Sequence, residues 1–186
     1  CTNGHVDVFR YEVFNGRVTR LSLGPNGEEG NGGSFYPAIS DDGTRVVFES
    51  HATNLDLAQT TTGKQVFLWT ESNDTTSGTG TVTYISNGNA DSLDASISGD
   101  GARIVFTTFA DVLDKDAGTH TNGETDTNKN SDVILWENDQ FHFAGRGEDG
   151  SLPKDGDTRE GIISPNGQMI SFVSSGRNMV TGKGLA

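Results

Sequence analysis

The chain has 186 residues, of which 32% are apolar and 25 are glycine, and its formal net charge is −13. Glycine at nearly twice its usual share favours a chain rich in turns and poor in helix. The charge argues against a nucleic-acid surface, because binding a phosphate backbone needs clustered Lys and Arg, and no run of 18 apolar residues is present to span a membrane.

Short strands are the elements that the sequence predicts. Apolar runs of four or five residues stand between clusters of Gly, Asn and Asp, which is typical of strands and turns. In chain order we expect strands at Val8–Tyr11, Val18–Ser22, Pro37–Ser40, Arg45–Ser50, Val66–Thr70 and Val82–Ser86, two within Leu93–Phe106, then Val133–Trp136 and Phe141–Ala144, and two within Gly161–Phe172.

One phrase occurs three times in the chain. It runs over Tyr36–Phe48, Leu93–Phe106 and Gly161–Phe172, and its turn glycines, Gly43, Gly101 and Gly167, are 58 and 66 residues apart. A regular spacing of this size indicates an array of repeated units rather than one irregular domain.

Each complete unit contains four strands, which we name A to D in chain order. Strands B and C are apolar at successive positions, as in Val46-Val47-Phe48, so both faces of their sheet must be covered. Stacked four-stranded antiparallel sheets, the blades of a β-propeller, satisfy this requirement. The Asp-Gly and Asn-Gly corners between A and B are suited to tight hairpins with glycine at positive φ.

The phrase Ser-x-Asp-Gly followed by an apolar strand resembles the WD40-like repeat of the TolB type, also called PD40. The match is carried by Ser40–Phe48 and Ser98–Phe106, whereas the third copy has Asn166 in place of Asp and Ser171 inside strand B. The resemblance implies an all-β propeller in a bacterial protein that is periplasmic or secreted. It says almost nothing about activity.

The repeats amount to about three blades, and the chain starts and stops between strands B and C. We expect one propeller segment made of a half-blade at 1–30, blades at 31–88 and 89–147, and a half-blade at 148–186. Propellers have about four to eight blades. The chain is therefore expected to be a piece of a longer propeller or one half of a six-bladed ring formed by a homodimer.

An acidic segment between strands B and C of the third unit is the candidate metal site. Oxygen side chains at alternate positions can curl around a hard cation such as Ca²⁺. A competing interpretation is a solvated loop whose Asp and Asn side chains cap turns. The candidate calcium ligands are Asp126, Asn128, Asn130, Asp132, Asp114 and Asp116.

No catalytic residue is predicted, and the first hypothesis for function is a non-catalytic binding or scaffold module. Its protein or glycan partner would meet the face where the long B-to-C and D-to-A connections emerge, since binding residues concentrate on such loops. The alternatives are an accessory propeller of a larger prolyl oligopeptidase-like hydrolase and a sugar-active propeller.

Three aromatic side chains, Tyr11, Trp69 and Trp136, occupy one position in successive units. Packing between blades explains equivalent aromatic residues better than a sugar-binding platform does.

Overall fold

The computed structural model describes residues 2–59, 61–72, 79–111, 113, 130–148, 150–153 and 155–180. These residues form twelve strands and no helix, so they contain no helix that could span a membrane. The strands form two four-stranded antiparallel sheets and two two-stranded ones. The predicted fold class, all-β with partial propeller blades of four antiparallel strands, is confirmed.

The strands follow the predicted order of C and D, twice A to D, then A and B. Their bounds are β1 (Phe9–Tyr11), β2 (Val18–Arg20), β3 (Ser34–Ile39), β4 (Arg45–Ser50), β5 (Gln65–Glu71), β6 (Gly80–Tyr84), β7 (Ser92–Ile97), β8 (Arg103–Thr108), β9 (Asp132–Glu137), β10 (Gln140–Phe143), β11 (Thr158–Ile163) and β12 (Ile170–Ser174).

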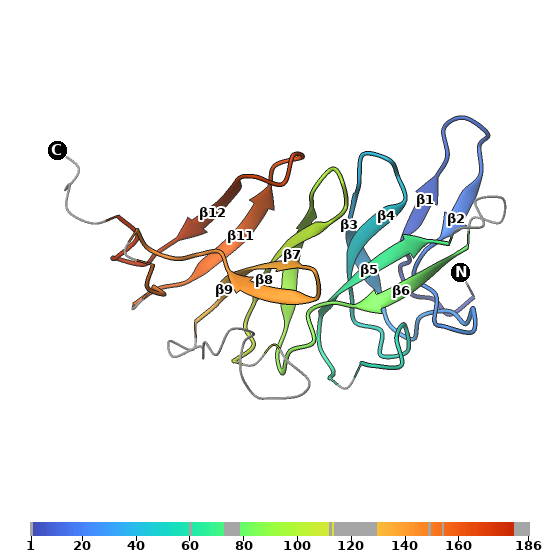
Figure 1. The fold of residues 1–186 in the computed structure, drawn as a ribbon. Coiled ribbons are helices and arrows are strands. Elements are labelled where there is room, and N and C mark those ends of the chain that lie inside the picture. The colour runs from blue at the N-terminus through green and yellow to red at the C-terminus, as the bar shows by residue number, and fades with distance from the viewer. Residues whose placement is uncertain are drawn as a thin grey trace.

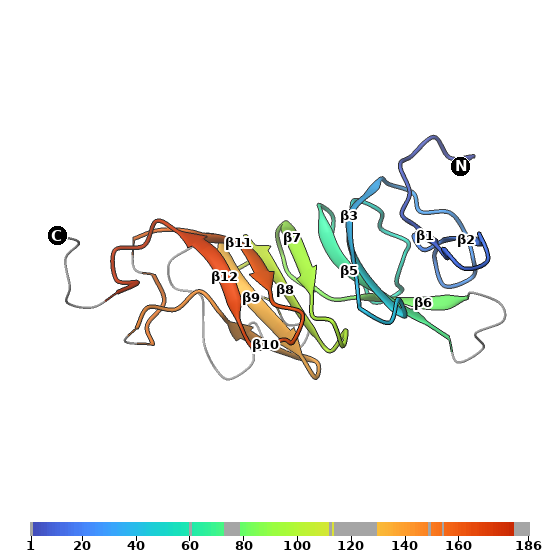
Figure 2. The same ribbon diagram turned by 90° about the horizontal axis from the view of Figure 1, so that it is seen from above.

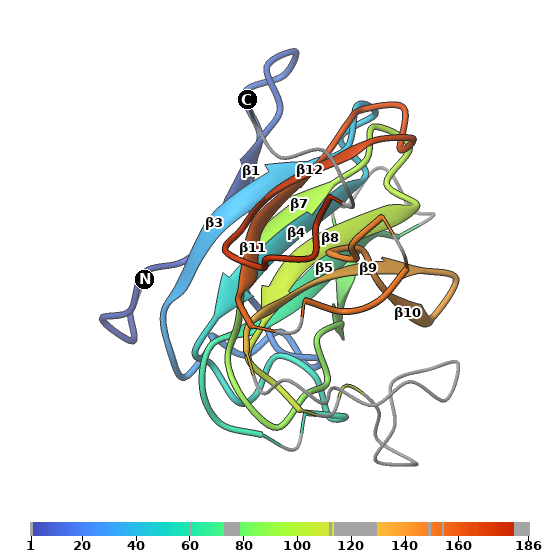
Figure 3. The ribbon, with the colours of Figure 1, turned by 90° about the vertical axis from the view of Figure 1, so that its left-hand side faces the viewer.

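The four sheets stand in an open row. The β1–β2 sheet lies at one end and the β11–β12 sheet at the other, with the chain termini at opposite ends (Figures 1 and 2). A view along the row shows the sheets stacked behind one another, with β3 and β11 toward one side and β9 and β10 toward the other (Figure 3). The A-to-B hairpins emerge on one side of the row, and the ends of β4 and β8, from which the B-to-C connections start, lie on the opposite side (Figure 1).

Strands B and C are covered on both faces, as their sequences predict. Val47 and Leu68 pack toward the β7–β10 sheet, whereas Phe48, Phe67 and Trp69 pack toward the β1–β2 sheet. A third apolar cluster joins β8 and β9 to β11 and β12. Each sheet therefore supplies the apolar layer that covers its neighbour.

Strand A is longer than predicted because a β-bulge lies inside it. In β3 the register with β4 shifts between Phe35 and Ala38, and Tyr36 adopts a φ of 53°. The same bulge recurs at Asp94 and Glu160, both with φ of 56°. The bulge allows the strand to continue upstream of Pro37, where the sequence had placed its start.

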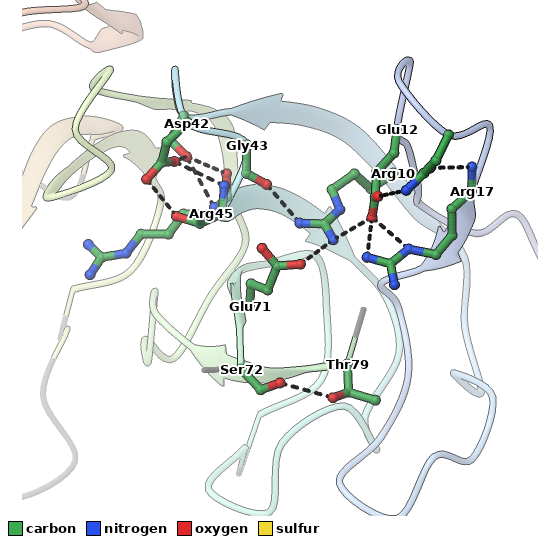
Figure 4. A network of polar contacts seen from close by, with 12 residues as sticks. Arg10, Glu12, Arg17, Asp42, Gly43, Arg45, Glu71, Ser72 and Thr79 are labelled. Carbon is green, nitrogen blue, oxygen red and sulfur yellow. Dashed lines mark hydrogen bonds and ion pairs between the residues drawn. The ribbon is translucent and has the colours of Figure 1, made fainter. Parts of the chain in front are cut away.

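The repeated Ser-x-Asp-Gly turn is a hydrogen-bonded unit. Asp42 accepts the Ser40 hydroxyl at 2.6 Å and the Thr44 N–H at 2.9 Å, while Ser40 Oγ accepts the Arg45 N–H (Figure 4). Asn166 accepts the equivalent hydroxyl and N–H groups through Oδ1 in the third copy. The Asn-for-Asp departure therefore preserves the turn, and its glycine has a φ of 70°, close to those of the other two.

Neighbouring turns are also joined to one another. The Asp41 N–H donates to the Gly99 carbonyl at 2.8 Å, and the Gly99 N–H donates to the Pro165 carbonyl at 2.7 Å. The Arg45 guanidinium adds a bond to the Gly101 carbonyl in the next unit. Turn geometry and sheet-to-sheet spacing are therefore fixed by the same residues.

The charge of Asp42 predicts a pH dependence of stability. The Ser40 hydroxyl, followed by the Thr44 N–H, lowers the pKa of Asp42 from 3.8 to about 2. A carboxylate with a depressed folded-state pKa contributes stability above its unfolded pKa, and this contribution disappears as the pH falls through its folded pKa. In Asp42→Asn the side-chain oxygen can still accept both hydrogen bonds, as Asn166 Oδ1 does in the third copy, but the side chain has no charge to titrate.

We therefore expect the unfolding free energy of Asp42→Asn to vary less between about pH 4 and pH 2 than that of the unchanged chain. Urea titrations across this pH range measure the difference. Equal pH dependence in the two proteins would contradict this account of the turn.

Candidate functional site

The predicted calcium ligands lie mostly outside the described residues. Asp114, Asp116, Asp126 and Asn128 fall there, and only Asn130 and Asp132 are described. Asp132 begins β9 opposite Thr108, and its side chain is buried. Within the described ranges no three His, Cys, Asp or Glu side chains are arranged to hold a metal ion.

The candidate site with the most structural definition is the long-loop face. We define it by the B-to-C and D-to-A connections, residues 21–33, 51–64, 85–91, 109–131 and 144–157, as far as these are described. The two B-to-C connections begin at the ends of β4 and β8, two of the most deeply buried strands.

A repeated local motif anchors the base of these connections. Ser50 Oγ accepts the Ala52 N–H at 3.0 Å, and Thr108 Oγ1 accepts the Ala110 N–H at 3.1 Å. The alanines are followed three residues later by Leu55 and Leu113, which are 1% and 0% exposed. Each connection is therefore held against the core by two buried side chains, an alanine and a leucine, within five residues of the end of its strand.

The carboxy-terminal half-blade repeats the turn at the corresponding place, at the end of β12. Ser174 Oγ accepts the Gly176 N–H at 3.0 Å. This motif was not predicted from the sequence. Its pattern is a serine or threonine, a small residue two positions later and an apolar residue three positions after that.

Asn31 joins two connections of the long-loop face. Its side chain accepts the Thr53 N–H at 2.7 Å and donates to the Thr53 hydroxyl, while its own N–H donates to the Asn54 side chain. Asn54 in turn donates to the Glu29 carbonyl. These bonds fix residues 29–31 against residues 53–54 and pre-organise this part of the surface.

The amino-terminal segment is attached to the same region through the Glu29 carboxylate. It forms an ion pair with Arg20 at 2.6 Å and accepts the Thr2 hydroxyl at 2.9 Å. The Arg20 hydrogen bond, followed by that from Thr2, lowers the pKa of Glu29 to about 2. Glu29 is therefore ionised at neutral pH and holds this segment in place.

Two apolar side chains project from the fixed base of the long-loop face. Leu57 is 87% exposed and Phe109 is 49% exposed, each close in sequence to a buried anchor of its own connection. A large exposed apolar side chain on a rigid support is suited to fill a pocket on a protein partner.

The edge of the row formed by the A strands β3, β7 and β11 carries a second group of charged residues, at and around the strand A bulges. The buried Glu49 carboxylate accepts the Asp94 N–H at 2.7 Å and pairs with Lys64 at 3.1 Å. Partial burial raises the pKa of Asp94, and the Glu160 carboxylate adds to that rise. Thr107 replaces Glu49 in the next unit and accepts the Glu160 N–H at 3.0 Å. The bonds of Glu49 to Asp94 and of Thr107 to Glu160 join adjacent sheets, which gives these side chains a structural role.

Arg10 closes the space between the first two sheets on the hairpin side. Its guanidinium donates to the Gly43 carbonyl at 2.9 Å and pairs with Glu71 and Glu12 (Figure 4). It also lies 4.7 Å from the centre of the Trp69 ring. Because Gly43 and Glu71 belong to the second sheet, these bonds join the first two sheets. The Arg10 side chain is only 7% exposed.

The aromatic series divides between the interior and the end of the row. Trp69 is 2% exposed in the core between the first two sheets, and Trp136 packs partly buried against the next cluster. Tyr11 is 61% exposed, because no sheet formed by the described residues covers its face of β1. Packing between blades thus accounts for the two tryptophans.

A cleft of 650 Å³ lies between β2 and β6, with Arg17, Arg20 and Trp69 in its lining. A sugar platform needs an open aromatic face on which a ring can stack. With 2% exposure Trp69 does not offer one.

Comparisons with known proteins give the following similarities. No protein-family model matches the sequence, and the curated proteins include no match. A crystal structure of TolB from Acinetobacter baumannii is similar at a TM-score of 0.45 and 16% identity, covering 89% of this chain and 31% of TolB. A prolyl endopeptidase structure is similar at a TM-score of 0.45 and 14% identity, covering 89% of this chain and 22% of that one. The chain therefore spans less than a third of either protein.

The loop anchors predict a contrast between two leucines of the same connection. Leu55→Ala removes a side chain that is 1% exposed and should lower the unfolding free energy by about 2–5 kcal/mol. Leu57→Ala removes one that is 87% exposed and should change it by about 0.5 kcal/mol or less. Urea unfolding measures both, and similar losses would show that the connection is not anchored as described.

Proposed function

We propose that the chain is a non-catalytic binding module that docks a protein partner on its long-loop face. The observation that carries the proposal is the projection of Leu57 and Phe109 from connections whose bases are fixed by buried anchors. A surface that is already ordered loses little conformational entropy when a partner binds, which favours affinity. Leu57, the more exposed of the two, is aliphatic and offers no ring on which a sugar could stack, which favours a protein over a glycan as the partner.

A position-specific cross-linking experiment tests this proposal. A photoreactive benzoyl-phenylalanine replaces Leu57 in one sample and Val13, which is equally exposed at 87%, in the control. Val13 lies in the β1–β2 hairpin on the opposite side of the row (Figure 1). Irradiation in cells of the native host should link one protein other than a second copy of this chain through position 57, and position 13 should not link that protein.

The purified partner then allows a quantitative check. Leu57→Asp should weaken its binding at least tenfold, equivalent to about 1.4 kcal/mol, because a charge would replace the apolar contact. Val13→Asp should leave the affinity unchanged. Equal cross-linking of that partner at both positions contradicts the proposal, and so does binding to a glycan array that Leu57→Asp leaves intact.

The proposal includes a structural calcium ion in the segment from Asp114 to Asp132. Its support is the alternation of Asp and Asn side chains, the oxygen ligands that calcium prefers. An ion bound only by the folded state stabilises it by mass action. Millimolar CaCl₂ should therefore raise the melting temperature above that in equal MgCl₂.

Asp126→Asn is the matched variant for this measurement, because it removes one charged ligand and keeps the shape of the side chain. The calcium-dependent rise should shrink or disappear in this variant. An unchanged melting temperature for the unaltered chain in calcium would reject the ion.

A further inference from the structure

The two ends of the row expose opposite halves of the same four-stranded unit. In the described residues β12 is a strand B whose only strand partner is β11, and β1 is a strand C whose only strand partner is β2. The complete sheets show which pairing is missing, because strand B pairs with strand C in both of them. Open strand edges of this kind are templates for pairing with another chain.

The amino-terminal end exposes apolar side chains whose equivalents are buried in the interior of the row. Phe9 is 45% exposed, whereas Phe67 at the same place in the next unit is 0% exposed. Ile39 is 54% exposed, compared with 9% for Ile97 and 5% for Ile163. These side chains have the chemistry of an interface between sheets but lack a covering sheet.

The carboxy-terminal end presents the complementary surface. Ile162 and Val173 are 62% and 52% exposed on the outer face of the β11–β12 sheet. Ile162 occupies the place that Ala38 holds in the second sheet, where Ala38 packs against the cluster containing Ile97. By the same relation, Ile162 would face Ile39 of a following unit.

We propose that two copies of this chain pair end to end, with β12 of each copy beside β1 of the other. The interior pairs Phe48↔Phe67 and Val47↔Leu68 then set the register, which places Phe172 opposite Phe9 and Ser171 opposite Arg10 of the second copy. Each junction completes one four-stranded sheet.

A second copy of the chain can pair with both ends of the row at once. It supplies a C–D pair for β12 and an A–B pair for β1, and it covers Phe9 and Tyr11 at one end and Ile162 at the other. Two copies give six sheets, a number within the range of about four to eight that closed propellers use. The contact repeats head to tail and closes after two copies, so neither β12 nor β1 keeps the open edge at which its sheet is incomplete.

Light scattering on the intact chain tests the pairing. We expect a molar mass about twice the 19.8 kDa of one chain. Ile162→Asp should restore the mass of a single chain, because the charge would be buried opposite Ile39, whereas the exposed control Leu57→Asp should keep the doubled mass. A single-chain mass at every concentration overturns the proposal, as do open-ended larger species or equal effects of the two variants.

Disulfide trapping tests the register independently of affinity. The pairs Arg45↔Thr70 and Arg103↔Glu137 predict that Met169 lies opposite Glu12 of the second copy. In a Cys1→Ser background, Glu12→Cys and Met169→Cys are made as separate proteins. Mild oxidation of their mixture should give a linked dimer, because neighbours across paired strands lie within the Cα range of a disulfide, about 4.4–6.8 Å.

Neither protein alone should form the link, and a mixture of Met169→Cys with Leu57→Cys should give none. Equal yields in the mixture and the controls would overturn the proposed register.

Discussion

The apolar character of both faces of β4, β5, β8 and β9 is the constraint on which the rest of the structure depends. Val46 and Val47 are adjacent in sequence and point to opposite faces, yet both are buried, at 3% and 0% exposure. A sheet of this kind is stable in water only when another layer lies on each side, since each face carries a large apolar area. The stacked row follows directly, and so does the difference between its interior and its ends.

The sequence predicted what depends on local patterns. The Ser-x-Asp-Gly phrase located the hairpins because its side chains accept hydrogen bonds from backbone groups within five residues. Successive apolar residues located strands B and C. The strand A bulge was missed for a physical reason. Tyr36, Asp94 and Glu160 share a left-handed backbone conformation and the same distance from the turn glycine of their unit. None of them is a glycine or an asparagine, so no residue type at this place signals the positive φ.

The position of the long-loop face could be predicted from the sequence, but the hydrogen bonds that hold it together could not. The length of the connections indicated where it lies, whereas the bonds of Asn31 to Thr53 and Asn54 join residues from separate connections. Such contacts arise only after the sheets have brought the connections together. The serine and threonine anchors are different, because Ser50, Thr108 and Ser174 repeat at fixed offsets within each unit and could have been recognised from spacing.

Stacking also links the proposed partner site to the proposed pairing. Successive sheets in the row keep the same strand direction, so their B-to-C connections all emerge on one side (Figure 1). A two-fold ring built by continuing this stacking would place the Leu57 regions of both copies on that same side. A partner with two equivalent docking segments could then bind both, and the second contact would form at the high effective concentration set by the first. Ile162 and Leu57 lie on different surfaces, so Ile162→Asp would remove this gain while leaving each single contact intact.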